Sequence, residues 1–198
     1  MKKGEQTRQH IVQHAAPIFN TRGYSGTSIQ DVLRETGLEK GGLYNHFKSK
    51  DELALESFDY AVQLLREAHK AAQQGRQGTL DRLQGIFEVT LRSAQGEILA
   101  GGCPILNVSV ESDDTHPLLK EKAQQAAMSL QNFIAQVLAV GIKKGEMKPE
   151  LDPEATARVL FALFEGGILL TKLHDNPAYL HDARTHMLAL LKLYQQEA

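Results

Sequence analysis

The chain has 198 residues, which is enough for one large domain or two small ones. Its hydrophobic content is ordinary for a soluble protein, so we expect no membrane segment, no secretory leader and a cytoplasmic location. The single cysteine, Cys103, excludes an intrachain disulfide, which fits a reducing compartment. Residues 1–50 carry eight Lys and Arg against four Asp and Glu, although the net charge of the whole chain is −2. A basic end on an acidic body suits one-ended binding to a polyanion.

Hydrophobic spacing predicts helices along the whole chain, with no alternating strand pattern and no internal repeat. The first helix should run from about Glu5 to Thr21 and stop at Gly23, and two short helices should follow within residues 27–47. Ser49 should then cap a fourth helix that reaches about Ala72. After a linker at residues 73–78, further helices are expected at residues 79–93, 103–112, 117–144, 153–173 and 177–195. The predicted fold class is all-α.

The first of the two short helices has clear start and stop signals. Ser28 followed by Asp31 predicts a capped helix start, because the hydroxyl can accept from an exposed amide and the carboxylate suits the positive helix end. Apolar residues then recur at spacings of three and four. Gly37 can end this helix in the left-handed conformation at little cost.

The second short helix should present a polar surface to a partner. Leu43 and Phe47 are four residues apart and can face inward together. The residues that this leaves outside are Lys40, Gly41, Gly42, Tyr44, Asn45 and His46. Glycine costs about 1 kcal/mol relative to alanine in a helix, and close backbone approach to another surface would explain two of them. A helix-turn-helix that lays its second helix in the DNA major groove has this arrangement.

This part of the chain resembles the DNA-binding domain of the tetracycline-repressor (TetR) family of bacterial transcriptional regulators, from about Arg8 to about Ala61. The matching residues are Gly23-Tyr24, Thr27-Ser28, Asp31-Val32, Gly37-Leu38, Lys40-Gly41-Gly42-Leu43-Tyr44, His46-Phe47 and Lys50-Asp51-Glu52-Leu53. Residues that depart from the family's common choices are Leu33, Thr36, Glu39 and Gly42, of which the last two bear on base reading. The resemblance implies an N-terminal three-helix helix-turn-helix DNA-binding domain at residues 1–50, extending into the linking helix to about residue 61. It also implies a C-terminal helical effector-binding and dimerisation domain at residues 51–198.

The resemblance further implies a sequence-specific, DNA-binding transcriptional repressor that a small-molecule effector releases from its operator. Phosphate contacts are expected from Tyr44, His46 and Lys50 by the family pattern, and from Thr27 and Ser28 at the start of the second helix. Base contacts are expected from Lys40, Gly42, Asn45 and Gln30, with Gly41 allowing close approach. An alternative for Tyr44 is packing against the fourth helix, and the two roles can coexist.

The last two predicted helices are apolar over more than one face, whereas a single helical hairpin buries one stripe per helix. They are either fully buried core helices or half of a four-helix bundle made by two copies of the chain. The resemblance favours a homodimer, which would also place two recognition helices on a palindromic double-stranded operator. The expected interface residues are Leu163, Gly166, Gly167, Leu170, Met187, Leu190, Leu191 and Tyr194.

An effector pocket is expected in the C-terminal part, where each candidate residue is otherwise plain core. The candidates are Phe87, Leu91, Cys103, Asn107, Met128, Phe161 and Phe164. Three interpretations of Cys103 remain open: a pocket contact, a thiol sensor and a buried small hydrophobe.

Sequence patterns for other chemistry are weak. His10 and His14 are spaced to share a helix face, but no third ligand accompanies them, so no metal site is expected. No cofactor motif and no catalytic arrangement stand out, and we do not expect an enzyme. The alternatives are a helical ligand-binding or enzyme-like protein with an incidental helix-turn-helix, and a structural adaptor. Neither alternative predicts salt-dependent affinity for DNA.

Overall fold

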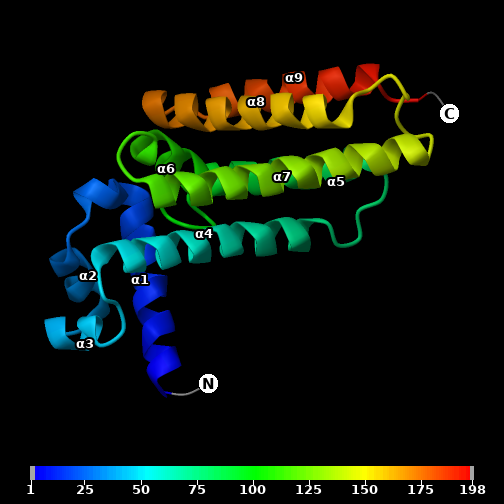
Figure 1. The fold of residues 1–198 in the computed structure, drawn as a ribbon. Helices are drawn as coiled ribbons and strands as arrows, with labels where there is room; N and C mark the ends of the chain where they lie inside the picture. The colour runs from blue at the N-terminus through cyan, green and yellow to red at the C-terminus, as the bar shows by residue number, and fades with distance from the viewer. Residues whose placement is uncertain (1–2, 197–198) are drawn as a thin grey trace. The chain divides into compact units, whose positions relative to one another are not determined.

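The computed structural model describes residues 3–196, and within this range the chain forms α-helices and no strand (Figure 1). The helices are α1 (Lys3–Gly26), α2 (Ile29–Thr36), α3 (Lys40–Tyr44), α4 (Lys50–Ala72), α5 (Thr79–Ala94), α6 (Pro104–Ser112), α7 (Pro117–Lys143), α8 (Pro153–His174) and α9 (Ala178–Leu193). The predicted all-α class is confirmed. The largest difference in bounds is in α1, which was expected to end at Thr21.

Gly23 explains that difference. Its backbone has φ 75° and ψ 172°, so the helical path is broken there, and one further turn follows to Gly26. A positive φ of this kind is open to glycine and strained for other residues. Gly23 therefore interrupts the helix as predicted, but the chain makes an extra turn before α2 begins.

The chain divides into two compact units. The first holds the chain through Leu65 together with Gly96–Gln124. The second holds Arg66–Gln95 together with the chain from Gln125 onward. Helices α4 and α7 contribute residues to both units, and α6 belongs to the same unit as α1, α2 and α3.

A small apolar core holds the first unit together. Ile11 of α1, Val32 of α2, Leu43 of α3 and Leu53 of α4 are all fully buried in it, and Phe47 from the turn after α3 joins them. Each short helix thus buries one side against α1 and α4. Because α2 and α3 are too short to be stable alone, this shared core is what maintains them.

The second unit has a larger core formed by α5, α8, α9 and part of α7. Leu83, Leu160 and Met187 are fully buried there, and the rings of Phe87 and Phe164 meet edge to face with centroids 4.9 Å apart. At the start of α8 an aspartate caps the helix. The carboxylate at residue 152 accepts from the amides of residues 154 and 155, at 3.0 Å each.

One of the described helices, α7, is long and apolar enough to cross a membrane by length and composition alone. The expectation of no membrane segment stays a prediction. The finding is weak evidence for a membrane span, because the core helix of a soluble protein passes the same test.

Candidate nucleic-acid interface

Helix α2 begins and ends as its local sequence predicts. The Ser28 hydroxyl accepts from the Asp31 amide at 3.2 Å, and the Asp31 carboxylate accepts from the Ser28 amide at 2.9 Å, which completes a capping box. The bonds that the Asp31 carboxylate accepts from the Ser28 hydroxyl and amide, with weaker help from Arg22 and Arg34, lower the pKa of Asp31 below its ordinary value. Gly37 ends the helix in the left-handed conformation with φ 68°.

Helix α3 exposes the polar residues that the sequence assigned to a partner. Leu43 is fully buried, whereas Lys40 and Asn45 are exposed and the Tyr44 side chain is 44% exposed. The Lys40 ammonium lies 5.9 Å from the centre of the Tyr44 ring, so the two side chains form one cationic and aromatic patch. Gln30, on the neighbouring α2, is also exposed.

The two glycines of α3 are not required by the fold of the chain itself. A Cβ atom added to Gly41 would meet nothing within 4 Å, and one added to Gly42 would only touch Leu38 at 3.9 Å. Neither glycine has a positive φ. Larger residues would therefore fit within the protein, and the open space lies on the outside, where a partner's surface would approach the backbone.

Thr27 differs from the expectation. Its side chain is 1% exposed and its hydroxyl donates to the Gly23 carbonyl at 2.7 Å, so this group fastens the turn before α2 and is not presented at the surface. Ser28 is exposed, but its hydroxyl donates to the Asp31 carboxylate at 2.6 Å. The Thr27 hydroxyl is thus engaged inside the fold and the Ser28 hydroxyl within the capping box, and phosphate contacts by these two residues remain predictions.

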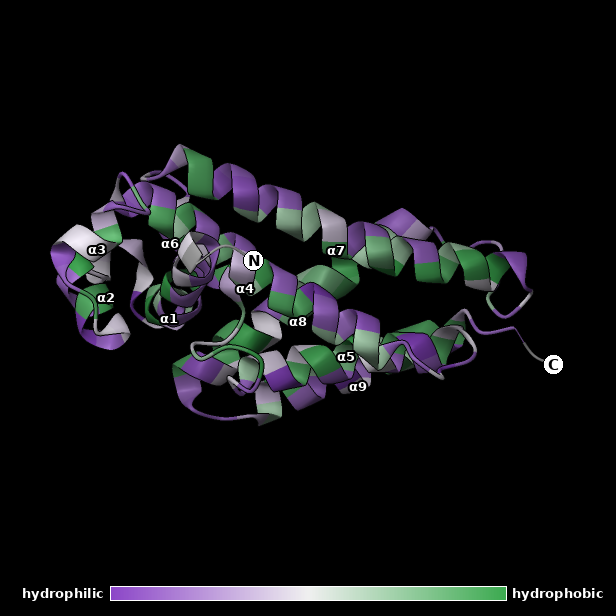
Figure 2. Ribbon diagram, turned by 90° about the horizontal axis from the view of Figure 1, so that it is seen from below, coloured by the Kyte–Doolittle hydropathy of each residue, from purple (hydrophilic) through white to green (hydrophobic). Residues whose placement is uncertain are grey.

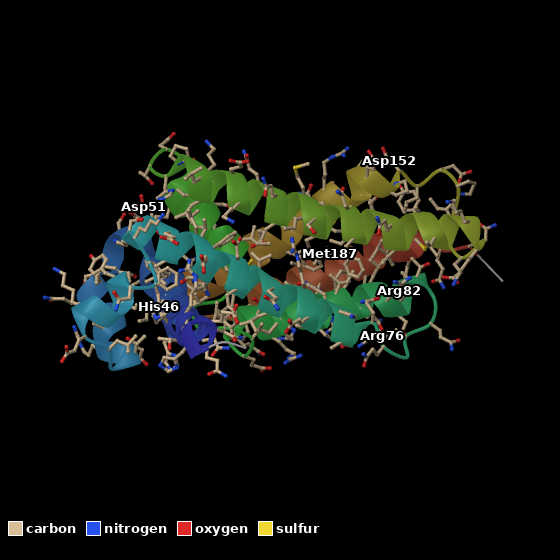
Figure 3. All side chains as sticks on the ribbon, turned by 60° about the horizontal axis from the view of Figure 1, so that its bottom comes forward. His46, Asp51, Arg76, Arg82, Asp152 and Met187 are labelled. Atoms are coloured by element: carbon tan, nitrogen blue, oxygen red, sulfur yellow. The ribbon has the colours of Figure 1, made fainter. Side chains whose placement is uncertain are left out.

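Arg8 of α1 joins the end of α3 to α4. Its guanidinium donates to Glu52 at 2.8 Å, to Glu56 at 3.1 Å and to the backbone carbonyl of His46. It also lies 4.1 Å from the centre of the Phe47 ring. The bond from Arg8, supported by the Lys48 amide, lowers the pKa of Glu52. The Arg8 side chain thereby holds the backbone at the half-buried His46, which was predicted to contact phosphate. His46 is labelled among the side chains in Figure 3.

Tyr24 connects the turn before α2 to the start of α4. Its hydroxyl donates to the Asp51 carboxylate, and this bond, with some burial, raises the pKa of Tyr24 to about 12. The Lys50 ammonium lies 4.2 Å from the centre of the same ring. His116 meets the ring edge to face with centroids 4.8 Å apart, and its Nε2 lies 3.9 Å from Asp51. Lys50, another predicted phosphate contact, is therefore placed by an aromatic ring of α1.

Glu111 of α6 holds the same turn from the other side. Its carboxylate accepts from the backbone amides of Tyr24 at 2.7 Å and Ser25 at 2.8 Å, which are left without helical partners by the break at Gly23. A Cβ atom at Gly23 would lie 2.5 Å from this carboxylate, so a larger residue there would push the Glu111 side chain away from these amides. The link between α6 and the turn before α2 spans 87 residues of sequence.

Sequence reasoning missed three positioning residues: Arg8, Tyr24 and Glu111. Tyr24 was noticed only as part of a family pattern, and nothing local marks the others, because an arginine or glutamate on a polar helix face is usually solvated. The roles of these three residues depend on partners 27 to 87 residues away. A hint was available in the early break of α1 at Gly23, since the freed amides there must find acceptors.

The predicted effector residues are divided between the two units. Phe87, Leu91, Met128, Phe161 and Phe164 belong to the second unit, where the two rings at 87 and 164 are buried against each other and Met128 is exposed. Cys103 and Asn107 belong to the first unit, where the cysteine is buried. The Asn107 amide donates to the Asn20 carbonyl at 3.0 Å and to the Gly101 carbonyl at 2.9 Å. An effector contact by any of the seven remains a prediction.

The predicted dimer residues lie on two different faces of the α8–α9 hairpin. Met187 and Leu191 are fully buried in the chain's own core, and a Cβ atom at Gly167 would lie 2.8 Å from Leu180 of α9. These three residues pack the hairpin internally. Leu163, Gly166 and Leu170 face away from it, with Leu190 and Tyr194 half-buried. Figure 2 shows the resulting mixture of apolar and polar residues along α8 and α9.

No metal-binding cluster of three His, Cys, Asp or Glu side chains occurs in the described part of the chain. His10 and His14 do meet, with ring centroids 4.1 Å apart, and the His14 ring nitrogen is 2.8 Å from the His10 carbonyl. This pair is a local contact along α1.

Comparisons with known proteins match both parts of the chain. Residues 11–56 match the family described as bacterial regulatory proteins, tetR family, and residues 79–187 match the tetracyclin repressor-like C-terminal domain. A TetR transcriptional regulator from Chloroflexus aurantiacus is 39% identical, with a TM-score of 0.93 and all of each chain covered. A TetR-family regulator from Cytophaga hutchinsonii is 31% identical, with a TM-score of 0.94 over 100% of this chain and 99% of the other. The repressor DhaR from a Mycobacterium species is 28% identical over 85% of this chain and 84% of its own length.

Proposed function

Because the chain belongs to the TetR family of DNA-binding transcriptional regulators, we propose that it is a repressor that binds a palindromic operator as a homodimer and leaves it when a small molecule binds. The relative DhaR is named as a repressor, which supports repression and not activation of transcription. The remaining steps are argued from the residues of this chain.

The observation that carries the proposal is the surface of α3. Lys40, Tyr44 and Asn45 are exposed there, beside two glycines whose missing side chains leave the backbone open. Lysine matches the acceptors of guanine, and asparagine matches the paired donor and acceptor of adenine, so both fit the major groove. Tyr44 contributes a hydroxyl donor for phosphate, and Lys50 contributes a cation at the start of α4.

An exposed apolar stripe on α8 supports the homodimer. Val159, Leu163, Gly166, Leu170 and Leu173 follow one another at helical spacings of four, three, four and three residues. The four large side chains are between 37% and 69% exposed. A Cβ atom at Gly166 would meet nothing within 4 Å, so a partner helix could approach the backbone closely at this point. A self-complementary stripe of this kind suits a two-fold interface, and two-fold symmetry matches an operator whose half-sites lie about 34–36 Å apart.

The first test measures operator binding. The full chain is mixed with DNA from the promoter beside its own gene, and mobility shifts are recorded across a salt series. We expect a strong fall in affinity with salt, because cationic contacts to phosphate release counterions. Tyr44→Ala and Lys50→Ala should each weaken binding to every sequence roughly 5- to 10-fold, and the lysine change should reduce the salt slope by about one per subunit.

Lys70→Ala is the matched control, since Lys70 is an exposed lysine on the same helix as Lys50 but in the second unit. It should leave affinity unchanged. A folded dimer without any salt-dependent shift would contradict the proposed function. If Lys50→Ala and Lys70→Ala changed DNA affinity equally, the phosphate role of Lys50 would be contradicted.

A further inference from the structure

Two exposed arginines, Arg22 and Arg34, converge on one carboxylate beside α2. Nη1 of Arg22 lies 3.0 Å from Oδ1 of Asp31, and Nη2 of Arg34 lies 3.3 Å from the same oxygen. The other oxygen of Asp31 accepts from the amide and hydroxyl of Ser28. Arg22 belongs to α1 and Arg34 to α2, so two segments contribute to this arginine pair. Neither arginine belongs to the predicted DNA contacts.

The arginine pair keeps most of its hydrogen-bonding capacity for an outside partner. Each guanidinium has five N–H donors, and within the described part of the chain each is paired only with Asp31. The side chains of Arg22 and Arg34 are 55% and 76% exposed. Arg8, the third arginine of the first unit, instead binds at three points inside the fold. Two cations also share one anion, so the cluster has a net charge of about +1.

Arg34 lies on the side of α2 that is turned away from the apolar core. Val32 is fully buried, whereas Gln30 and Arg34, four residues apart, are exposed on the opposite side of the helix. In a helix-turn-helix the second helix enters the major groove, and the first helix crosses the DNA backbone. Helix α2 is that first helix, because α2 and α3 both lie within the matched DNA-binding region. Cations on its outer side are therefore placed to meet phosphates.

We propose that Arg22 and Arg34 bind the phosphate backbone of duplex DNA, as a contact separate from those of Tyr44 and Lys50. This rests on the proposed function. A guanidinium presents paired N–H donors that match two phosphate oxygens, and it stays charged at any ordinary pH. Phosphate contacts carry no base information, so the arginine pair strengthens binding to every sequence and leaves the preference between sequences unchanged.

The first test replaces each arginine in the full chain. Mobility shifts are recorded across a salt series with the promoter DNA and with an unrelated duplex of the same length. Arg22→Ala and Arg34→Ala should each weaken both complexes by the same factor, roughly 3- to 10-fold. Each should also make the salt dependence less steep by about one per subunit. Arg66→Ala is the matched control, since Arg66 is an exposed arginine in the second unit, and it should change neither quantity.

A lysine variant separates charge from shape and from folding defects. Arg34→Lys keeps the cation but loses the guanidinium fork, so it should keep the wild-type salt slope while affinity falls about 2- to 5-fold. Exposed ion pairs contribute little to stability, so all variants should unfold at the wild-type urea midpoint. If Arg34→Lys flattened the slope as much as Arg34→Ala does, a charge contact to phosphate would be contradicted.

The remaining outcomes separate this inference from the proposed function. If the wild-type chain binds DNA with a steep salt dependence but either alanine variant behaves like Arg66→Ala, the arginine pair is overturned and the proposed function stands. A loss confined to the promoter DNA, with an unaltered salt slope, would indicate base reading and would also overturn it. If the folded wild-type chain shows no salt-dependent shift, both the proposed function and this inference fail.

Discussion

The exposed surface of α3 and the exposed stripe of α8 have opposite chemistry. The first presents lysine, tyrosine and asparagine, and the backbone at its end accepts a hydrogen bond from Arg8, a residue of a distant segment. The second presents leucine and valine on a helix whose other side is buried in an apolar core. Directional contacts to bases and phosphates require each donor to be placed accurately. An apolar contact is non-directional and depends on area and shape.

The comparison leads to different expectations for substitutions. On the α3 side, residues that never touch DNA should matter because they position those that do. On the α8 side, a single charge should disrupt the surface because it cannot be accommodated in an apolar interface.

The largest effect is expected from Leu170→Glu. Two-fold symmetry would place the new carboxylate in the interface twice, without a partner, so the homodimer should dissociate. Loss of the second half-site should lower operator affinity on the order of 100-fold. Light scattering gives the mass and mobility shifts give the affinity. Leu118→Glu, an exposed leucine at the start of α7, is the control. A variant that stays dimeric would show that the stripe is not the interface.

A pH effect is expected from the core of the second unit. Burial lowers the pKa of His69 to about 4 from its ordinary 6.5, and its Nδ1 has no partner in the described chain. The unfolded chain takes up a proton near pH 6.5 while the folded chain does not. Stability should therefore be complete above pH 6.5 and fall by about 2–3 kcal/mol as the pH drops to about 4.

Urea unfolding at a series of pH values measures this loss. His69→Phe should remove it, whereas His181→Phe, on an exposed residue of α9, should keep it. In the first unit Asp31 and Glu52 have lowered pKa values, so their stabilising contribution is present at ordinary pH and is lost only under more acidic conditions. The same pH profile for wild type and His69→Phe would contradict the assignment.

An intermediate effect is expected from Arg8, which does not belong to the exposed surface of α3. Arg8→Ala should lower operator affinity roughly 5- to 10-fold, the order of one or two charge-assisted hydrogen bonds at a partly exposed site. Arg8→Lys should restore little, because one ammonium cannot span Glu52, Glu56 and the His46 carbonyl together. Mobility shifts give the affinity. Full rescue by lysine would show that only charge matters.

The smallest change in affinity is expected from Asn45→Ala. Affinity for the best site should fall only about 3- to 5-fold, while preference at one base position is relaxed. Selection from a randomised operator library measures the preference at each position. Gln30→Ala serves as a comparison, since it should affect a different position or none. An unaltered profile for Asn45→Ala would exclude base reading by this residue.

Local features of the fold could be predicted because their causes are local. The Ser28 capping box, the left-handed Gly37 and the cap at Asp152 each depend on residues within three or four positions, and all are present. Leu43 and Phe47 are buried together as their spacing indicates.

Other features could not be predicted because they depend on distant segments. Thr27 was expected at the surface, but the extra turn after Gly23 buries it. The sequence predicted a domain boundary near residue 50. It gave no sign that α6, much later in the chain, belongs to the same unit as the helix-turn-helix, as the Glu111 bonds reflect. Tertiary structure was also needed to choose between a buried core hairpin and half of a four-helix bundle. Spacing alone does not tell which apolar stripe of α8 is covered by α9.

The sequence by itself determined the helices, the capping box at Ser28 and the polar surface of α3, since propensity, capping and hydrophobic spacing act over a few residues. It also indicated the family, through the residues that match the TetR pattern. Tertiary structure decided which side chains hold that surface in place. It also decided that Gly167 packs against α9 whereas Gly166 faces open space. Those features come from contacts between segments that are far apart along the chain, and no short-range pattern records them.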